Sequence, residues 1–498
     1  MPATPKNAAA IILLKDAADP KVFWVKRNDK LAFMGGFHSF PGGQLDKEDL
    51  AIAVAGSESE EAAKMHVCAV REMFEEAGIL VTRGADRLSA GRLAQKRRAL
   101  EEGQRSFKDL LDEDQLLIDA SLLVDAGRWV TPPFAPRRYD TWFFLSWLPE
   151  GQEAVVEPGE LELGEWVRPA EALERWKRGE SIMAPPTLFI IRTLAAHGSR
   201  VDGIAQALTS IPEAHHGLVR RIEVRAGMFL YPVRTPTLPP ATHTNCYIVG
   251  GNELIVVDPA SPYEEEQKEL DTLIDSLLAE GRKVREILVT HHHHDHWAGV
   301  DHLRNRLSVP VAAHPLTVQR LSNSLKIDRT VEDNELIGLE GDPGWRLRVL
   351  HTPGHTRGHI SFYEENSGAV LTGDLVVGVG TVVIDPPEGN MVQYYASLNR
   401  LLELPKLSTL LPAHGPAIAS AKGKLEEYIA HRNMREAKIL DAVRGGAETP
   451  GEIVEAAYTD VSPAMYGLAE RSTVAHLEKL EAEGRVNLDG GGRYKAVA

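Results

Sequence analysis

A cluster of histidines constrains this chain more than any other feature of its sequence. Residues 290–299 read THHHHDHWAG and directly follow EILV, an apolar run typical of a buried strand. His291 and His293 are two positions apart, so in an extended segment they project to one side. Asp295 and His296 follow where a helix would begin and can turn toward a second position. Because imidazole nitrogen and carboxylate oxygen are zinc ligands, the segment predicts a metal-binding loop at a strand end.

A histidine-rich tract without a fixed structure is the alternative interpretation. Three later segments argue against it, because each supplies a donor after a strand-like run. LHTPGHTRGH contains His355, LTGD contains Asp374 and LPAHGP contains His414. The chain therefore has enough donors for two metal ions.

The pattern THxHxDH with these followers resembles the metallo-β-lactamase superfamily over residues 222–432. By this resemblance His291, His293 and His355 bind one metal, Asp295, His296 and His414 bind the other, and Asp374 bridges them. Asp295 is also expected to be catalytic. The resemblance implies an αββα sandwich, two Zn²⁺ or other divalent transition metals, and hydrolysis, but it does not imply β-lactam hydrolysis.

The remaining histidines near the motif do not have the spacing expected of a further metal ligand. His359 shares a loop with His355, and we expect either a role beside the ligands or a structural one. The others are expected in packing, at the surface or next to the ligands, namely His292, His294, His302, His314 and His351.

A second cluster is acidic. The segment REMFEEAGI places Glu72, Glu75 and Glu76 on one helical face, opposite an apolar stripe that includes Val70 and Phe74. Three neighbouring carboxylates repel one another unless a cation neutralises them, and such oxygen donors suit Mg²⁺ or Mn²⁺. A solvated acidic face is the alternative.

This segment and the upstream FPGGQLD resemble the Nudix hydrolases over residues 5–200. The resemblance implies that Glu72, Glu75 and Glu76 bind metal, with the Gly43 carbonyl as a further ligand and Arg71 orienting the carboxylates. It makes Glu72 and Glu76 catalytic in hydrolysis of a nucleoside diphosphate linked to another group. A last metal-binding glutamate is expected among three positions, Glu160, Glu162 and Glu165.

The Nudix box is expanded. Gly43 lies 28 residues before Arg71, farther than the family's spacing, and Ala63 stands where the first glutamate of the box is expected. The phrases TPPFAPRRYDTWFF and EWVRPAEAL resemble the coenzyme A diphosphatase-type branch, and this makes the insertion a substrate-facing lid or loop. A domain that binds its nucleotide without cleaving it is the alternative.

The last part of the chain changes to helical patterns and ends in LDGGGRYKAV, a hairpin-like tail. It resembles the winged helix associated with some metallo-β-lactamase-like hydrolases, whose relatives include endoribonucleases and thioesterases. Because STVAHLEKLEAEGRV is acidic for a nucleic-acid recognition helix, we expect this unit to serve packing or homodimer formation.

Length and charge set the outer limits. A chain of 498 residues allows about three domains. We expect a multidomain protein of α/β and α+β class. Its parts are a Nudix α/β/α fold at 1–205, the sandwich at 220–432 and a winged-helix-like domain at 433–498. Residues 195–221 are the predicted connector.

The net charge of −16 disfavours non-specific nucleic-acid binding. Cys68 and Cys246 sit among apolar neighbours and are expected to be buried thiols. No apolar run approaches the roughly 18 residues of a membrane span, and charged residues rather than a cleavage site follow the first apolar stretch, so we expect a cytoplasmic protein.

Three functional hypotheses follow. In the first, the Nudix site cleaves the diphosphate of coenzyme A derivatives and the second site cleaves their thioester. In the second, less favoured, the histidine-rich centre cuts RNA. In the third, the Nudix domain is a catalytically silent nucleotide-binding module that regulates its neighbour.

Overall fold

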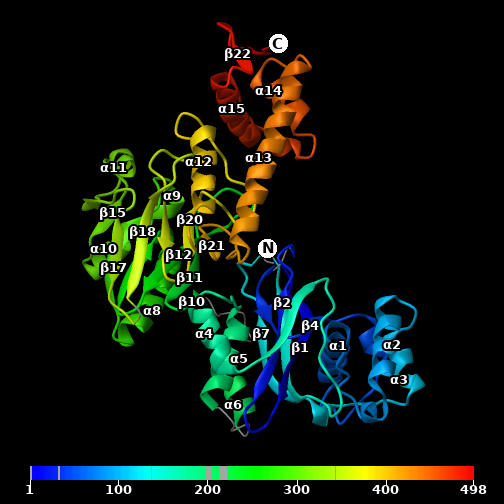
Figure 1. Ribbon diagram of the computed structural model, residues 1–498. Helices are drawn as coiled ribbons and strands as arrows, with labels where there is room; N and C mark the ends of the chain where they lie inside the picture. The colour runs from blue at the N-terminus through cyan, green and yellow to red at the C-terminus, as the bar shows by residue number, and fades with distance from the viewer. Residues whose placement is uncertain are drawn as a thin grey trace. The chain divides into compact units, whose positions relative to one another are not determined.

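A computed structural model describes residues 3–31, 34–135, 137–197, 203–211, 221–342 and 344–497. The chain forms two compact units, Met1–Ala226 and Gly227–Ala498 (Figure 1). Within the predicted connector, residues 198–202 and 212–220 lie outside the described residues, and 203–211 carry a short helix, α6 (Ile204–Leu208).

The first unit is built on a mixed sheet with the order β3-β2-β1-β8-β7, in which β4 also pairs with β1 and β9 with β2. Strands β1 and β2 are antiparallel and form a hairpin at the start of the unit. The strands of this unit are β1 (Lys6–Lys15), β2 (Lys21–Arg27), β3 (His38–Ser39), β4 (Gly42–Gln44), β5 (Val54–Ala55), β6 (Ile118–Asp119), β7 (Val124–Val130), β8 (Tyr139–Trp147) and β9 (Leu161–Val167).

Helices cover both faces of this sheet. The α-helices are α1 (Glu60–Ala77), α2 (Ala90–Glu101), α3 (Phe107–Glu113), α4 (Pro169–Lys177) and α5 (Pro185–His197). Along β1, Ile11 and Leu13 pack in the core that contains α1, whereas Ile12 and Leu14 pack in the core that contains α4 and α5. Figure 1 shows α1 and α5 on opposite sides of the sheet. Alternate burial on both faces confirms the predicted α/β/α layering.

Helix α1 has well-defined ends. The Ser59 hydroxyl caps its start by accepting a hydrogen bond from the Ala62 N–H, and Gly78 ends it with a φ of 71°. The segment 84–128 is charged and has a helical pattern in its sequence, and it holds α2 and α3 but ends in strand β7. Strand β7 contains a register shift between Asp125 and Arg128, so it lacks the regular alternation of a strand.

The second unit contains two sheets. The first has the order β11-β12-β13-β14-β15-β16, and the second β17-β18-β19-β20-β21. The strands are β11 (Met228–Arg234), β12 (His243–Gly250), β13 (Glu253–Val257), β14 (Lys283–Val289), β15 (Val311–Ala313), β16 (Arg329–Thr330), β17 (Leu336–Leu339), β18 (Trp345–His351), β19 (Ile360–Glu364), β20 (Ala369–Gly373) and β21 (Thr409–Pro412). Strand β10 (Ile222–Arg225) precedes them.

Separate helical layers cover the two sheets. The helices of this region are α8 (Glu264–Ala279), α9 (His294–Trp297), α10 (Val300–Leu307), α11 (Pro315–Leu321) and α12 (Met391–Leu402). Leucines of α8 and α10 pack with β12 to β15, whereas Tyr394 and Leu398 of α12 pack with β20 and β21. This arrangement is the predicted αββα sandwich.

The C-terminal region consists of α13 (Ala421–Arg444), α14 (Pro450–Ala457), α15 (Tyr466–Ala482) and a hairpin of β22 (Val486–Leu488) and β23 (Tyr494–Ala496). Ile439, Val454 and Leu477 share one small core. Figure 1 shows α13 running from beside α12 to the small domain. The helices and terminal hairpin confirm the winged-helix prediction, and α13 continues through residue 432, where we placed a domain boundary.

Both cysteines are buried free thiols, as predicted. Among the described residues, we find no helix with the length and apolar character needed to cross a bilayer.

Candidate functional site

The predicted zinc ligands of the second unit come from loops at the ends of strands. His291 and His293 follow β14, Asp374 follows β20 and His414 follows β21. Asp295 and His296 lie in the short helix α9, and His355 lies in the loop between β18 and β19. The structure thus brings together all the donors that the sequence indicated.

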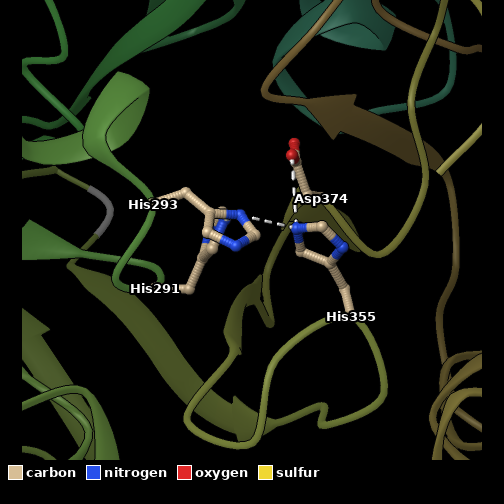
Figure 2. Close-up of side chains that lie close together, drawn as sticks. All are labelled: His291, His293, His355 and Asp374. Carbon is tan, nitrogen blue, oxygen red and sulfur yellow. Dashed lines mark hydrogen bonds and ion pairs between the residues drawn. The ribbon is translucent and has the colours of Figure 1, made fainter. Parts of the chain in front are cut away.

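The first group contains His291, His293, His355 and Asp374, whose ligand atoms lie within 4.8 Å of one another. Nδ1 of His293 is 3.0 Å from Nε2 of His291 and 2.9 Å from Nε2 of His355. Figure 2 shows the side chains of His293 and His355 pointing toward one another, with the Asp374 carboxylate nearby. Three converging ring nitrogens are a donor set that suits zinc.

The second group contains Asp295, His296 and His414, also within 4.8 Å. Asp374 lies between the two groups. Its Oδ2 is 3.7 Å from Nε2 of His355 and 3.5 Å from Nε2 of His296, and its Oδ1 is 3.4 Å from Nε2 of His414. One carboxylate therefore faces both groups, as a bridging ligand must.

Two buried atoms at this centre lack hydrogen bonds. Nε2 of His296 and Oδ1 of Asp374 have no hydrogen-bond partner in the described part of the chain. Buried polar atoms are normally paired, so these donors fit a cation. Burial lowers the pKa of His293 to about 2, so its ring is neutral and one of its two nitrogens has a free lone pair, as a metal ligand requires.

The first unit gathers the acidic residues of α1. Arg71 donates from Nη1 to Glu72 and to Glu75, at 2.9 Å each, as its predicted orienting role requires. Its Nε and Nη2 form a bidentate pair with Asp49, at 2.8 and 3.0 Å. Asp49 belongs to the insertion in the box and its side chain is 0% exposed. The neighbouring Leu50 is 54% exposed, so burial here is confined to Asp49, and a substrate-facing lid or loop stays a prediction.

Strand β4 touches the other carboxylates. The Gly42 N–H donates to Oε2 of Glu76 at 2.8 Å, and Gly43 packs directly against the Glu72 carboxylate. Burial, and then the charge of Glu72, raise the pKa of Glu76 to about 8. Burial, partly offset by Arg71, raises the pKa of Glu72 to about 7. Carboxyl groups held in this way are stabilised in their charged form by a cation.

The three candidates for a further glutamate differ in their surroundings. Glu162 forms an ion pair with Lys26 at 2.7 Å, and Glu165 forms one with Arg175 at 2.6 Å. The charge of Glu160 contributes to the raised pKa of Glu76, so Glu160 lies on the side of the carboxylate cluster.

Three family models match separate parts of the chain. They are described as the metallo-beta-lactamase superfamily at residues 239–414, the NUDT19 Nudix domain at 54–194 and the beta-lactamase-associated winged helix domain at 449–493. The beta-lactamase-like protein 2 homolog of Drosophila melanogaster is 31% identical over 49% of this chain and 84% of its own length. The chain belongs to the metallo-β-lactamase superfamily. It is a hydrolase that also carries a Nudix domain and the associated winged helix.

Two further comparisons cover single parts of this superfamily member. The atrochrysone carboxyl ACP thioesterase AgnL7 of Paecilomyces divaricatus is 30% identical over 45% of this chain and 67% of its own length. A crystal structure of a NUDIX hydrolase from Alicyclobacillus acidocaldarius is 28% identical, covers 42% of this chain and 99% of its own, and has a TM-score of 0.37.

Asp258 lies beside the metallo-β-lactamase centre, and the sequence motifs did not indicate it. It directly follows β13, has a φ of 51° and is 2% exposed. It accepts hydrogen bonds from the N–H and hydroxyl of Thr290, at 2.8 and 2.7 Å, and lies 2.8 Å from Nδ1 of His296. An aspartate directly after the apolar run LIVV was the available signal.

His359 also acts beside the metallo-β-lactamase centre. Its Nε2 accepts a hydrogen bond from the Asp374 N–H at 3.0 Å, and its Nδ1 lies 2.9 Å from the Thr352 hydroxyl. It therefore holds the backbone of Asp374. Of the other histidines, His302 pairs with Asp271 at 2.9 Å, and His314 stacks on His351 with ring centroids 4.2 Å apart.

Proposed function

We propose that the second unit hydrolyses acyl thioesters, with coenzyme A derivatives as substrates, at a centre of two zinc ions. His291, His293 and His355 would hold one ion and Asp295, His296 and His414 the other, bridged by Asp374. The observation that carries this proposal is the position of Asp374, whose carboxylate lies within 3.7 Å of His355 in the first group and within 3.5 Å of His296 and His414 in the second.

Residues of the chain would orient the metal ligands and accept a proton during the reaction. Nδ1 of His355 donates to the Val383 carbonyl at 2.8 Å, and Nδ1 of His414 donates to the His243 carbonyl at 2.9 Å. Both rings therefore present Nε2 to the centre. When bound, zinc ions would lower the pKa of water toward about 7 and polarise the thioester carbonyl. We assign to Asp295, whose Oδ2 lies 3.6 Å from Nε2 of His414 inside the second group, the acceptance of a proton from the attacking water. The C–S bond then breaks, and Asp295 would return this proton to the departing thiolate sulfur.

Two observations support a thioester rather than RNA. A relative that matches this part of the chain is named a thioesterase. The net charge of −16 also opposes the attraction of a polyanion.

We propose further that the Nudix unit is active and cleaves the diphosphate of the same class of molecule. Glu72, Glu75, Glu76 and the Gly43 carbonyl would hold Mg²⁺ or Mn²⁺, which would neutralise the phosphate charge. Glu72 and Glu76 would serve as the catalytic carboxylates. We assign Glu160 as the further metal ligand, because its charge contributes to the raised pKa of Glu76. The other two candidates, Glu162 and Glu165, form ion pairs with Lys26 and Arg175.

A cation for the substrate lies beside these carboxylates. Arg27 is the last residue of β2. Its positive charge offsets part of the rise that burial causes in the pKa of Glu76. Its buried Nε has no hydrogen-bond partner in the part of the chain that the structure describes. A guanidinium in this position suits a phosphate oxygen.

Product analysis by mass spectrometry tests both proposals. The full chain is incubated with a panel of acyl-coenzyme A molecules in the presence of Mg²⁺ and Zn²⁺. We expect 3′,5′-ADP to be released and to be lost only in Glu76→Gln, and free coenzyme A to be released and to be lost only in His293→Ala. If neither product forms, the coenzyme A proposal is wrong, and RNA is the next substrate to test.

A further inference from the structure

A single loop touches several ligands of the histidine centre. Residues 375–390 connect β20 to α12 and begin directly after Asp374. The Val383 carbonyl of this loop accepts the hydrogen bond from Nδ1 of His355 at 2.8 Å, and the Gly378 N–H donates to the His414 carbonyl at 2.6 Å. The conformation of the 375–390 loop therefore sets the orientation of His355.

Helices of the C-terminal region hold this loop on both sides of Val383. Arg432 of α13 donates to the Val382 carbonyl and, at 3.4 Å, to the Thr381 hydroxyl. The Ile384 N–H donates to the hydroxyl of Ser472 in α15 at 3.2 Å. The residues before and after Val383 are thus fixed by side chains that lie 50 or more positions later in the sequence.

Arg432 also reaches the other segment that positions His355. Its guanidinium lies over the ring of Tyr394 in α12, 5.3 Å from the centroid. Tyr394 packs so closely on Gly354 that a Cβ there would lie 2.4 Å from Cα of Tyr394. Arg432 is only 3% exposed and Ser472 only 6%, so both contacts are removed from competing water.

We infer that Arg432 and Ser472 are positioning residues for the zinc centre. They fix the Val383 carbonyl through its two neighbours, and that carbonyl holds His355 with Nε2 directed at the metal. Ser472 lies within the region matched by the winged-helix model. The winged helix therefore contributes to the assembly of the active site. This inference rests on the proposed zinc centre.

Zinc affinity measured on the full chain tests it. Metal-free protein is titrated with zinc against a chromophoric chelator, and kcat and KM for an acyl-coenzyme A are measured alongside. Mutating a residue that holds a metal ligand typically lowers metal affinity by about 10- to 100-fold. We therefore expect Arg432→Met to lower the affinity for one of the two zinc ions about 10-fold. Ser472→Ala, a milder change, should lower the affinity for the same zinc ion about 3-fold. Arg432→Lys, which keeps one donor, should restore part of the loss.

Arg435→Met is the matched control. Arg435 lies one turn further along α13, is also 3% exposed, and donates to the Ala457 carbonyl and to Asp460, away from the 375–390 loop. We expect it to leave zinc affinity within about twofold of the wild type, since distant sites behave independently.

The outcomes separate the two proposals. A wild-type chain that binds no zinc pair refutes the proposed centre and the inference with it. A wild-type chain that binds two zinc ions, with unchanged affinity in both Arg432→Met and Ser472→Ala, refutes the inference alone. If Arg432→Met does not fold, Ser472→Ala and Arg432→Lys decide.

Discussion

Replacing Gly43 by alanine should disable the Nudix site and leave the fold intact. A Cβ at this position would lie 2.4 Å from Cδ and Oε2 of Glu72. Non-bonded heavy atoms prefer separations of about 3.5 Å, so the carboxylate would have to move by about 1 Å. The displaced atoms end a flexible side chain, and the backbone need not follow. Since a displacement of about 1 Å can cost about 100-fold in rate, we expect that loss in diphosphate hydrolysis.

Three measurements and two matched variants make this prediction decisive. Mn²⁺ binding by electron paramagnetic resonance, product release and the thermal unfolding temperature are compared with the wild type. In Gly91→Ala the new Cβ meets only the Ser89 hydroxyl at 4.0 Å, and we expect no change. In Gly42→Ala it meets the Ala9 carbonyl of β1 at 2.4 Å, and we expect a lower unfolding temperature. A Gly43→Ala chain with normal Mn²⁺ affinity and turnover would refute the reasoning.

Two further predictions concern Asp258 and His38. Asp258→Asn removes the carboxylate beside His296 and should weaken zinc binding by about 10- to 100-fold in a chelator competition. Asp271→Asn, which alters the pair with His302, is its control, and equal affinities in the two variants would contradict the assignment. Burial lowers the pKa of His38 from 6.5 to about 4, so the unfolded chain binds a proton there before the folded one. The free energy of unfolding is therefore unaffected by His38 above pH 6.5, and it falls by up to about 3 kcal/mol as the pH decreases toward 4. His38→Leu should therefore lose less thermal stability than the wild type between pH 7 and 4.5, and parallel losses would contradict this.

The sequence carries the ligand pattern of the histidine centre because its donors lie within a few residues of the end of an apolar strand. Position relative to a strand end is a local property, and it places His291 and Asp374 without knowledge of the fold. The carboxylates of α1 are equally local, since Glu72, Glu75 and Glu76 are spaced by helical turns.

Residues that depend on contacts between distant segments are not visible in this way. Asp258 reaches Thr290 because β13 pairs with β14, with Val257 opposite Leu288. Arg432 and Ser472 reach the 375–390 loop from helices far along the chain. Strand β7 was missed because a register shift interrupts its alternation.

The buried ion pair of Asp49 and Arg71 makes the Nudix box depend on the segment inserted into it. The insertion that lengthens the Nudix box supplies the carboxylate that neutralises an arginine of the box itself, and that arginine is only 8% exposed. Deleting the inserted segment would leave a buried guanidinium without its bidentate partner, which is costly. A chain with the shorter box would therefore need a compensating change at Arg71.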